Sequence, residues 1–320
     1  MPTFLMLPPV DVEQRTWAKR LQADCPEFDV KVIEDEGELA QVLSSADAGY
    51  GWVPPDALPY AKNLRWLQNP MAGPPPDYYY QALVEHPVVV TNPRGIYSDH
   101  IAHHILMYML ALSRGLPYYL DAQRQNRWDR NARRRGYVDI ADSTVLINGV
   151  GGIGAEAGRL CLSLGATVIG IDPRGEELVE FEVLHPDALD GVLPSADFIV
   201  TTVPHTPETE FMWHRSRFAA MKTTAYFINV GRGMTAKLDD LVDALQKQEI
   251  AGAGLDVFEI EPLPEDHPLW KCENVIITPH VAVADAVNIS ERRYELLLDN
   301  ARRFVANEPL RNVVNKALRY

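Results

Sequence analysis

The sequence predicts an α/β protein with parallel sheets in two domains, on three observations. Short apolar segments rich in β-branched residues alternate with helical patterns along the chain. Such alternation is typical of parallel sheets covered by helices on both faces. The chain has 320 residues, which at about 150 residues per domain indicates two domains. Its 47% hydrophobic and 23% charged residues are those of a globular protein and exclude disordered, collagen-like and disulfide-stapled classes.

Five segments in the first part of the chain are predicted to be buried strands. They are short, apolar and bounded by Pro, Gly or Asp. Helical spacing of apolar residues separates some of them, over Val12–Ala23 and Gly37–Ser45. The predicted strands are Thr3–Leu7, Asp29–Ile33, Ala48–Val53, Leu64–Gln68 and Val88–Thr91.

The second part of the chain repeats this pattern on a larger scale. The alternation of strands and helices stops around Asn92, and a long, largely apolar helix is expected to begin near Ser98. A second strand–helix series runs from Thr144 to Pro279, and an amphipathic helix is predicted over Asn288–Ala306. These features predict one small and one larger α/β domain, with the terminal helix returning to the first.

Charge, cysteine content and the absence of long apolar runs restrict the expected partners and cellular compartment. The formal net charge is −14, which disfavours nucleic acid and anionic membranes as partners. The three cysteines show no metal-ligand spacing and indicate a reducing compartment. The first residues lack the basic flank of a signal peptide, and no apolar run approaches the roughly 20 residues of a membrane span. We therefore expect a cytoplasmic protein without a metal site.

A glycine-rich segment joins the predicted strand Thr144–Asn148 to a helical pattern. Gly149, Gly151 and Gly154 have the spacing G-x-G-x-x-G. In this context the first glycine permits a tight turn, the second lets the backbone approach a pyrophosphate, and the third lets helix and strand pack closely. The N–H groups at the start of the helix then face the phosphates, which predicts a dinucleotide site.

An acidic residue follows the next predicted strand, Thr167–Ile171. Asp172 lies 18 residues after Gly154 (172 − 154), where a carboxylate can bind the adenosine ribose hydroxyls and repel a 2′-phosphate. This position favours NAD over NADP. Arg174 is close enough in sequence to accept a 2′-phosphate, so NADP stays an alternative.

Charged side chains follow three further predicted strands. Arg232 follows one of them, Asp256 and Glu261 follow the next, and His280 follows the last. In open parallel sheets ligands bind beyond the carboxyl ends of the strands. We therefore expect these side chains at the same sheet edge as the glycine loop.

Together these motifs resemble, in order and spacing, those of the D-isomer-specific 2-hydroxyacid dehydrogenases. The matching segments are the glycine loop (Gly149–Gly154), Thr201–Thr209, the segment Ile228–Gly233 around Arg232, Asp256–Glu261, Thr278–His280 and Thr91–Ile96. The resemblance covers essentially the whole chain. It implies two Rossmann-like or flavodoxin-like domains with the active site in the interdomain cleft. The substrate-binding domain would be residues 1–96 plus 290–320, and the NAD-binding Rossmann domain residues 97–289.

The resemblance also implies roles that suit the residue types. His280 would be the general acid/base, because imidazole titrates near neutrality, and Glu261 would hold its orientation. Arg232 would bind the substrate carboxylate bidentately, so that Arg232 and His280 both contact substrate. Asp256 would orient the nicotinamide amide. The cofactor-binding residues would be Gly149, Gly151, Gly152, Ile153, Gly154, Asp172, Pro173, Arg174, Val203, Pro204, Val230, Gly231 and Asp256.

One loop departs from the resembled family, in which a loop of the small domain binds the substrate carboxylate through backbone N–H groups. Here Pro74 to Pro76 lack N–H donors, so Ala72 and Gly73 remain as the substrate-binding positions. The departure bears on substrate identity rather than on reaction class. Tyr78 to Tyr80 either wall a larger pocket or pack the small domain.

Two polar clusters have structural explanations. His100, His103 and His104 share one helix face, and Asp99 is the only carboxylate of matching spacing beside them. We therefore expect helix-start or interface residues rather than a metal site. The arginines from Arg124 to Arg135 are expected to form a solvated arm or a subunit contact. Because the resembled family uses this segment as a dimer arm, the resemblance implies a homodimer.

The resemblance favours an NAD-dependent oxidoreductase that reduces glyoxylate, hydroxypyruvate or a bulkier 2-keto acid to the D-2-hydroxy acid. A formate dehydrogenase is disfavoured, since its family has a glutamine where Glu261 stands. Two alternatives stay open. One is a phosphite-type dehydrogenase, which uses a similar Arg–Glu–His set. The other is an NAD(H)-sensing, corepressor-like scaffold, which binds the cofactor without turnover.

Overall fold

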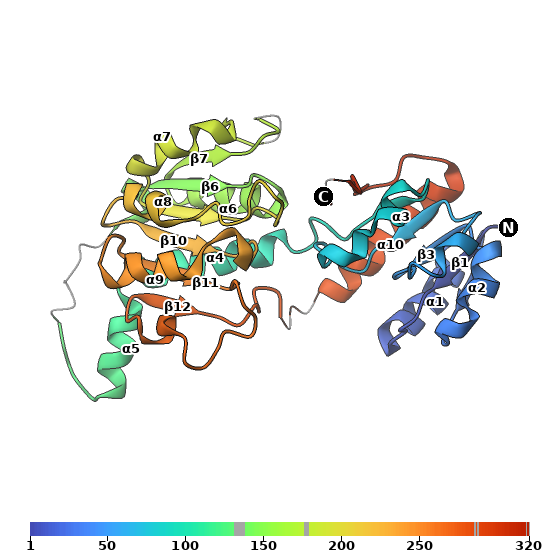
Figure 1. Ribbon diagram of the computed structural model, residues 1–320, viewed down its shortest axis with the longest axis horizontal. Coiled ribbons are helices and arrows are strands. Elements are labelled where there is room, and N and C mark those ends of the chain that lie inside the picture. The colour runs from blue at the N-terminus through green and yellow to red at the C-terminus, as the bar shows by residue number, and fades with distance from the viewer. Residues whose placement is uncertain (131–137, 176–178, 285, 287, 318, 320) are drawn as a thin grey trace. The chain divides into compact units, whose positions relative to one another are not determined.

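The computed structural model describes residues 1–130, 138–175, 179–284, 286, 288–317 and 319 (Figure 1). The chain forms two compact units. Unit 1 contains residues Met1–Ile96 and Val287–Tyr320, and unit 2 contains residues Tyr97–Ala286. Each unit has one parallel sheet, so the predicted α/β class with two parallel sheets is confirmed.

Unit 1 has a five-stranded sheet in the order β2-β1-β3-β4-β5. All four neighbouring pairs are parallel. Each strand lies within a segment that its composition predicts, shortened by one to three residues. The strands are β1 (Thr3–Met6), β2 (Asp29–Val32), β3 (Ala48–Tyr50), β4 (Trp66–Gln68) and β5 (Val89–Thr91).

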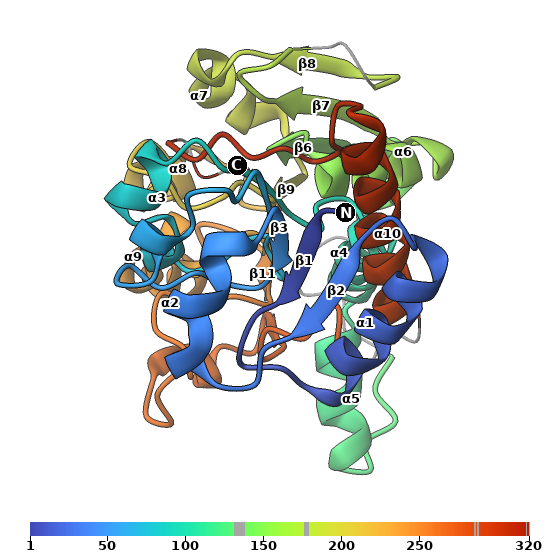
Figure 2. The same ribbon diagram turned by 90° about the vertical axis from the view of Figure 1, so that its right-hand side faces the viewer.

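Helices cover both faces of this sheet (Figure 2). The helices α1 (Val12–Asp24) and α10 (Ile289–Ala306) bury one face, and α2 (Leu39–Val42) and α3 (Gln81–Glu85) bury the other. The Asp11 side chain caps α1 by accepting from the Gln14 N–H, as the sequence of a capping box requires. The helix predicted over Gly37–Ser45 is instead α2 flanked by two short 3-10 turns.

The carboxyl-terminal tail is part of unit 1. Tyr294 of α10 packs on Trp17 with ring centroids 6.4 Å apart. Beyond α10 the Val314 N–H donates to the Val90 carbonyl at 2.8 Å. The Lys316 ammonium donates to the carbonyls of Leu83 and His86 at the end of α3. These contacts tie the tail to the sheet edge formed by β5.

Unit 2 has a seven-stranded sheet in the order β12-β11-β10-β9-β6-β7-β8. All neighbouring pairs are parallel, so the carboxyl ends of the strands lie at one edge. Strands β6 and β7 have the predicted bounds. The strands are β6 (Thr144–Asn148), β7 (Thr167–Ile171), β8 (Glu182–Leu184), β9 (Phe198–Thr201), β10 (Tyr226–Asn229), β11 (Gly252–Leu255) and β12 (Val275–Ile277).

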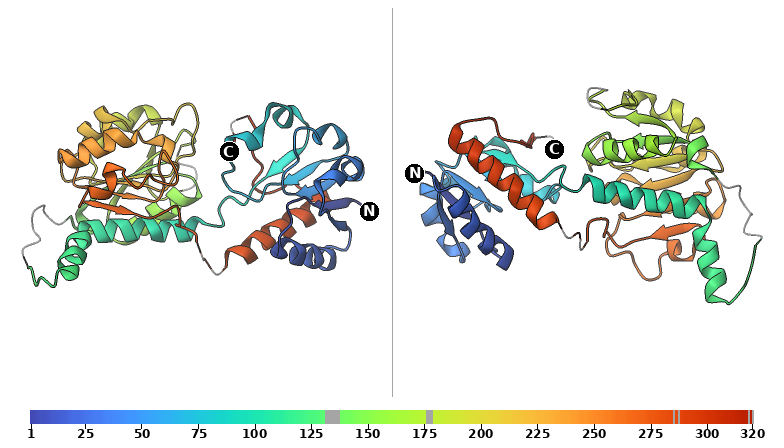
Figure 3. Two further views of the ribbon diagram at one scale, coloured as in Figure 1. Left: turned by 60° about the horizontal axis from the view of Figure 1, so that its bottom comes forward. Right: turned by 180° about the vertical axis from the view of Figure 1, so that it is seen from behind.

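Two cores lie on the two faces of this sheet. On one face α4 (Ser98–Ser113) and α6 (Gly152–Ser163) lie side by side (Figure 3). Three helices bury the other face: α7 (Leu189–Val192), α8 (Arg215–Ala220) and α9 (Leu238–Gln246). The structure therefore places α4 directly behind strands β10 and β11.

A further helix, α5 (Leu116–Arg124), extends away from the body of unit 2 (Figure 3). Gly115 separates it from α4 with a φ of +67°, a left-handed conformation that suits glycine. The polar arm predicted here is described only up to residue 130, and Arg133, Arg134 and Arg135 lie outside the described residues. Among the residues that the structure describes, no helix is long and apolar enough to cross a membrane.

Candidate active site

The glycine loop connects β6 to α6 at the carboxyl edge of the unit 2 sheet. Gly149 has a φ of +96°, and Gly151 precedes the first helical residue, Gly152. A Cβ on Gly154 would lie 2.0 Å from the Gly149 carbonyl oxygen, so only glycine allows this packing. Gly152 and Ile153 open the helix, and their N–H groups lack acceptors within the helix because they stand in its first turn. The loop therefore fits a pyrophosphate at a helix N-terminus.

Asp172 follows β7 beside this loop and is buried. Its carboxylate accepts the Val150 N–H at 2.8 Å and the Arg174 N–H at 3.0 Å. The Arg174 guanidinium adds bonds of 2.8 Å from Nε and 2.9 Å from Nη2 across the intervening Pro173. Burial alone would raise the Asp172 pKa, but these hydrogen bonds together hold the pKa below its ordinary value.

The loop after β9 adjoins the glycine loop, and the loop after β10 adjoins the loop after β9. The Thr202 hydroxyl, just after β9, donates to the Gly149 carbonyl at 2.6 Å. A Cβ on Gly231, after β10, would lie 2.7 Å from the Val203 carbonyl oxygen. Thus the predicted cofactor residues Val203, Pro204, Val230 and Gly231 lie in two successive loops on one side of the glycine turn, the loop after β9 being the nearer.

His280 and Glu261 are brought together as the sequence predicts. The His280 Nδ1 lies 2.9 Å from the Glu261 Oε2, while the other oxygen, Oε1, accepts the Phe258 N–H at 2.9 Å. Both side chains are partly exposed, at 52% for His280 and 37% for Glu261. Because Nδ1 is engaged by the carboxylate, Nε2 is the ring nitrogen left to meet a ligand.

Arg232 stands after β10, and it is partly buried. Its Nη1 donates to the Gly231 carbonyl at 2.7 Å. Burial lowers the pKa of the guanidinium, and the nearby negative charge of Glu261 opposes that effect. The structure thus brings Arg232, Glu261 and His280 into one electrostatic group at the carboxyl edge of the sheet.

Asp256 has a second role that its sequence position did not reveal. It is 1% exposed, and its Oδ1 accepts the Thr278 hydroxyl at 2.5 Å and the Val281 N–H at 2.9 Å. Its Oδ2 accepts the Ala282 N–H at 3.1 Å. A carboxylate oxygen can accept two bonds, so Oδ2 has capacity for one further donor, such as an amide of the nicotinamide.

The sequence analysis did not identify two residues that contact the segment carrying His280. His104 and Tyr108 of α4 both approach the Thr278 hydroxyl, with Nε2 at 3.0 Å and Oη at 2.5 Å. His104 was expected to be a helix-start or interface residue, but its side chain is only 14% exposed and lies against Asp256. Gly254 could have signalled this contact, because a glycine inside a strand often marks a close approach.

The predicted substrate loop lies in unit 1 and is described there by itself. The Asn92 side chain donates to the Ala72 carbonyl at 2.8 Å, and Gly73 next to it is exposed. The hydroxyls of Tyr78 and Tyr80 donate to the Gly51 and Val53 carbonyls at 2.9 and 2.8 Å. Of the two readings left open for these tyrosines, packing of the small domain is the one that the structure bears out.

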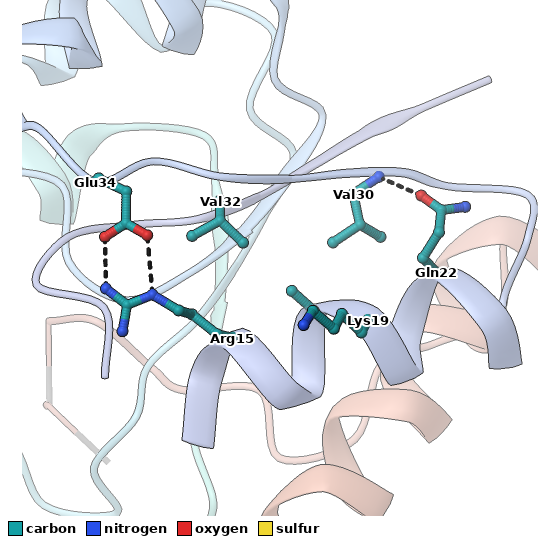
Figure 4. A pocket seen from close by; sticks show the side chains of 7 residues that line it. Arg15, Lys19, Gln22, Val30, Val32 and Glu34 are labelled. Atoms are coloured by element: carbon teal, nitrogen blue, oxygen red, sulfur yellow. Dashed lines mark hydrogen bonds and ion pairs between the residues drawn. The ribbon is translucent and has the colours of Figure 1, made fainter. Parts of the chain in front are cut away.

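A groove between α1 and β2 of unit 1 is a weaker candidate for a ligand site than the glycine loop and the His280 group of unit 2 (Figure 4). Arg15 and Glu34 pair across it with bonds of 2.9 and 2.7 Å, and Gln22 is held by the Val30 N–H. These polar groups satisfy one another. Elsewhere, no group of three or more His, Cys, Asp and Glu residues in the described chain could hold a metal ion.

Comparison with known proteins agrees with this site. Residues 106–282 match the family model for the D-isomer specific 2-hydroxyacid dehydrogenase, NAD binding domain. The chain is 31% identical over 295 residues to glyoxylate/hydroxypyruvate reductase B of Yersinia pestis bv. Antiqua, covering 90% of this chain and 88% of the relative.

Solved structures give the same result for the whole chain. A D-isomer specific 2-hydroxyacid dehydrogenase from Xanthobacter autotrophicus, in complex with NADPH and MES, is 30% identical with a TM-score of 0.81, covering 100% of this chain and 99% of that one. An NADPH-dependent glyoxylate/hydroxypyruvate reductase from Sinorhizobium meliloti, in complex with NADP and sulfate, is 26% identical with a TM-score of 0.80 and the same coverage. The chain therefore belongs to the D-isomer specific 2-hydroxyacid dehydrogenase family of NAD(P)-binding oxidoreductases.

Proposed function

We propose that this protein reduces a small 2-keto acid to the D-2-hydroxy acid, with His280 as the general acid. The observation that carries the proposal is the 2.9 Å contact between His280 Nδ1 and Glu261 Oε2. A carboxylate on Nδ1 fixes the ring and stabilises the imidazolium, so that the proton on Nε2 can pass to the carbonyl oxygen of the substrate. After reduction, His280 is left neutral and Glu261 keeps its charge.

The remaining groups complete the requirements of the reaction. When bound, the reduced nicotinamide supplies the hydride that reaches the carbonyl carbon. Arg232 binds the substrate carboxylate, and its burial strengthens that charge–charge attraction. Asp256 orients the nicotinamide amide through the remaining capacity of Oδ2. Ala72 and Gly73, in unit 1, stay the predicted backbone donors for the substrate, and the predicted active site in an interdomain cleft also stays a prediction.

For the cofactor, we propose NADH because Asp172 follows β7 beside the glycine loop, where a carboxylate can accept the ribose hydroxyls. The Arg174 guanidinium fills two of its acceptor positions here, so binding the ribose requires Arg174 to move aside. A second candidate, NADPH, is favoured by a specific observation. Arg174 forms a bidentate pair with Asp172, which offsets the negative charge that would repel a 2′-phosphate. The structural relatives described above are complexes with NADPH and NADP.

We propose that the protein is a homodimer through α4 and α5. Apolar side chains on these two helices and the following segment are exposed, and Trp128 is 94% exposed. Exposed apolar groups clustered on neighbouring elements are typical of an interface. The set is Met107, Leu110, Leu116, Leu120 and Trp128.

The test is a set of initial rates with NADH and with NADPH against glyoxylate, hydroxypyruvate, pyruvate and phenylpyruvate. Turnover with any of these acids and formation of the D product by chiral chromatography are expected. Phosphite with oxidised cofactor tests the phosphite-type alternative. Tight NADH binding without turnover of any substrate would overturn the proposal and favour the NAD(H)-sensing scaffold.

A further inference from the structure

The segment that carries His280 is anchored on both sides by a single carboxylate. Before His280, the Thr278 hydroxyl donates to Asp256 at 2.5 Å. After it, the N–H groups of Val281 and Ala282 donate to the same carboxylate at 2.9 and 3.1 Å. His280 itself has a φ of +56°, a conformation that costs a non-glycine residue energy and needs surrounding contacts to hold it.

The direction of each hydrogen bond around the Asp256 carboxylate follows from which groups can donate and which can only accept. Asp256, as a carboxylate, only accepts, so the one proton of the Thr278 hydroxyl points to it. The Thr278 oxygen then has only acceptor positions for its other neighbours. Tyr108 Oη, at 2.5 Å, therefore donates to it. Because the Tyr108 proton is used in this way, the His104 Nε2 has only acceptor oxygens before it, Thr278 Oγ1 at 3.0 Å and Tyr108 Oη at 3.1 Å, and donates to them. This arrangement requires His104 to carry a proton on Nε2.

The two donors are fixed by packing on the sheet. The Tyr108 ring lies so close to Gly254 of β11 that a Cβ there would approach its Cγ to 2.5 Å. The His104 ring lies edge-on to Tyr108, with centroids 4.8 Å apart and planes at 87°. Tyr108 is fully buried, and burial raises the pKa of its hydroxyl, which stays a donor at neutral pH.

We propose that His104 and Tyr108 are positioning residues for His280. They act through Thr278 and Asp256 and make no contact with substrate themselves. Their two bonds orient the Thr278 hydroxyl, the hydroxyl orients the Asp256 carboxylate, and the carboxylate fixes the backbone on either side of His280. The proposal rests on the proposed function of His280 as general acid.

The test compares variants that remove one donor without removing bulk. Tyr108→Phe keeps the buried ring, and His104→Leu removes the Nε2 donor, whereas His104→Gln retains an amide donor. Tyr294→Phe is the matched control, because it also deletes a buried tyrosine hydroxyl bond, to Asp24 at 2.5 Å, in unit 1. Loss of one such hydrogen bond corresponds to about a fivefold to tenfold effect.

We expect Tyr108→Phe and His104→Leu to lower kcat about fivefold to tenfold at nearly constant KM, and His104→Gln to recover most of the loss. Tyr294→Phe should leave kcat unchanged. Thr278→Val should lower kcat at least as much as Tyr108→Phe, and Thr278→Ser should retain activity. A merely structural role would instead lower the fraction of folded enzyme and leave kcat per folded site unchanged.

A second readout does not depend on turnover. We expect the Nδ1 proton of His280, in its bond to Glu261, to give a downfield NMR signal that His280→Gln identifies by its loss. We expect this signal to broaden or disappear in Tyr108→Phe and to persist in Tyr294→Phe. If the wild type shows no turnover, the proposed function fails, while the NMR comparison still tests the positioning role. An unchanged signal together with unchanged kcat in Tyr108→Phe and His104→Leu would overturn the inference.

Discussion

The Asp172 carboxylate and the Arg174 guanidinium form two parallel hydrogen bonds, Oδ1 to Nε at 2.8 Å and Oδ2 to Nη2 at 2.9 Å. Asp172 is buried, whereas the Arg174 side chain is 58% exposed. A Cβ placed on Gly151 would lie 3.8 Å from the same Nη2, so the guanidinium lies beside the glycine turn. The positive group can therefore meet a phosphate that the acid alone would repel.

The first prediction concerns this pair. Arg174→Ala should raise KM for NADPH at least about tenfold and change KM for NADH no more than about threefold, because only NADPH carries the 2′-phosphate that the guanidinium can bind. Steady-state kinetics with each cofactor measure the ratio. Arg159→Ala is the control, since Arg159 is another exposed arginine, paired with Glu156 on α6. Equal changes for both cofactors would contradict the assignment.

A second prediction concerns the catalytic group. His280→Ala and Arg232→Ala should each lower kcat/KM about 10²-fold to 10⁴-fold, since proton donation and carboxylate binding would be lost. Fluorescence titration should show that NADH binding survives in both. Glu261→Gln should lower kcat less than His280→Ala, because the ring persists but loses its carboxylate at 2.9 Å. An active His280→Ala enzyme would remove the general acid from the mechanism.

The third prediction is a pH dependence of stability. Burial lowers the pKa of His104 from its ordinary 6.5, and the neighbouring Asp256 opposes this only in part. The unfolded chain therefore binds more protons than the folded one between these two pKa values, so the free energy of unfolding falls as the pH drops below about 6.5. His104→Gln should lose less stability than the wild type between pH 8 and 5.5. Thermal unfolding at both pH values measures the difference.

The exposed His185 offers the control for this experiment. His185→Gln should show the same loss of stability as the wild type over that range. A His104→Gln protein that loses as much stability as the wild type would show that the buried ring does not drive the effect.

The fourth prediction concerns the predicted substrate loop. Asn92 donates to the Ala72 carbonyl, so Asn92→Ala should loosen the loop and raise KM for the keto acid severalfold with KM for the cofactor unchanged. Asn63→Ala removes a comparable side-chain bond, to the Ser44 carbonyl, and should change neither constant. Unchanged KM for every acid in Asn92→Ala would argue against Ala72 as a substrate-binding position.

The fifth prediction tests the proposed dimer. Leu120→Asp places a charge within the exposed apolar set of α4 and α5. It should shift the protein from dimer to monomer in sedimentation equilibrium, because burying an unpaired carboxylate in the interface costs free energy. Leu164→Asp places the same charge at another exposed leucine, after α6, and should leave the dimer intact. A monomeric wild type would dispose of the proposal at once.

Local signals in the sequence predicted most of the framework. The glycine spacing and the apolar runs identified β6 and β7 with their correct bounds, and the charged residues after β10, β11 and β12 identified the site edge. The short strand β8 and helix α5 were not predicted. Three residues of strand carry too little periodicity, and Gly115 and Pro117 interrupt the helical pattern where α5 begins.

The network under His280 could not be predicted in the same way. His104 and Thr278 are 174 positions apart, and their contact depends on how α4 packs against β11. The apolar pattern of α4 shows that the helix is buried but not which strand it meets. Only Gly254 hinted at a close approach, and a glycine in a strand does not name its partner.

The division of unit 1 between the two ends of the chain has a consequence for biosynthesis. Residues 97–286 form a contiguous unit and leave the ribosome before α10 and the tail. Until Tyr294 and Val314 emerge, the sheet face around Trp17 and the β5 edge have no cover, so nascent unit 1 exposes apolar surface. We therefore expect unit 2 to fold before unit 1, whose closure waits for α10 and the tail while chaperone contact and aggregation compete with it.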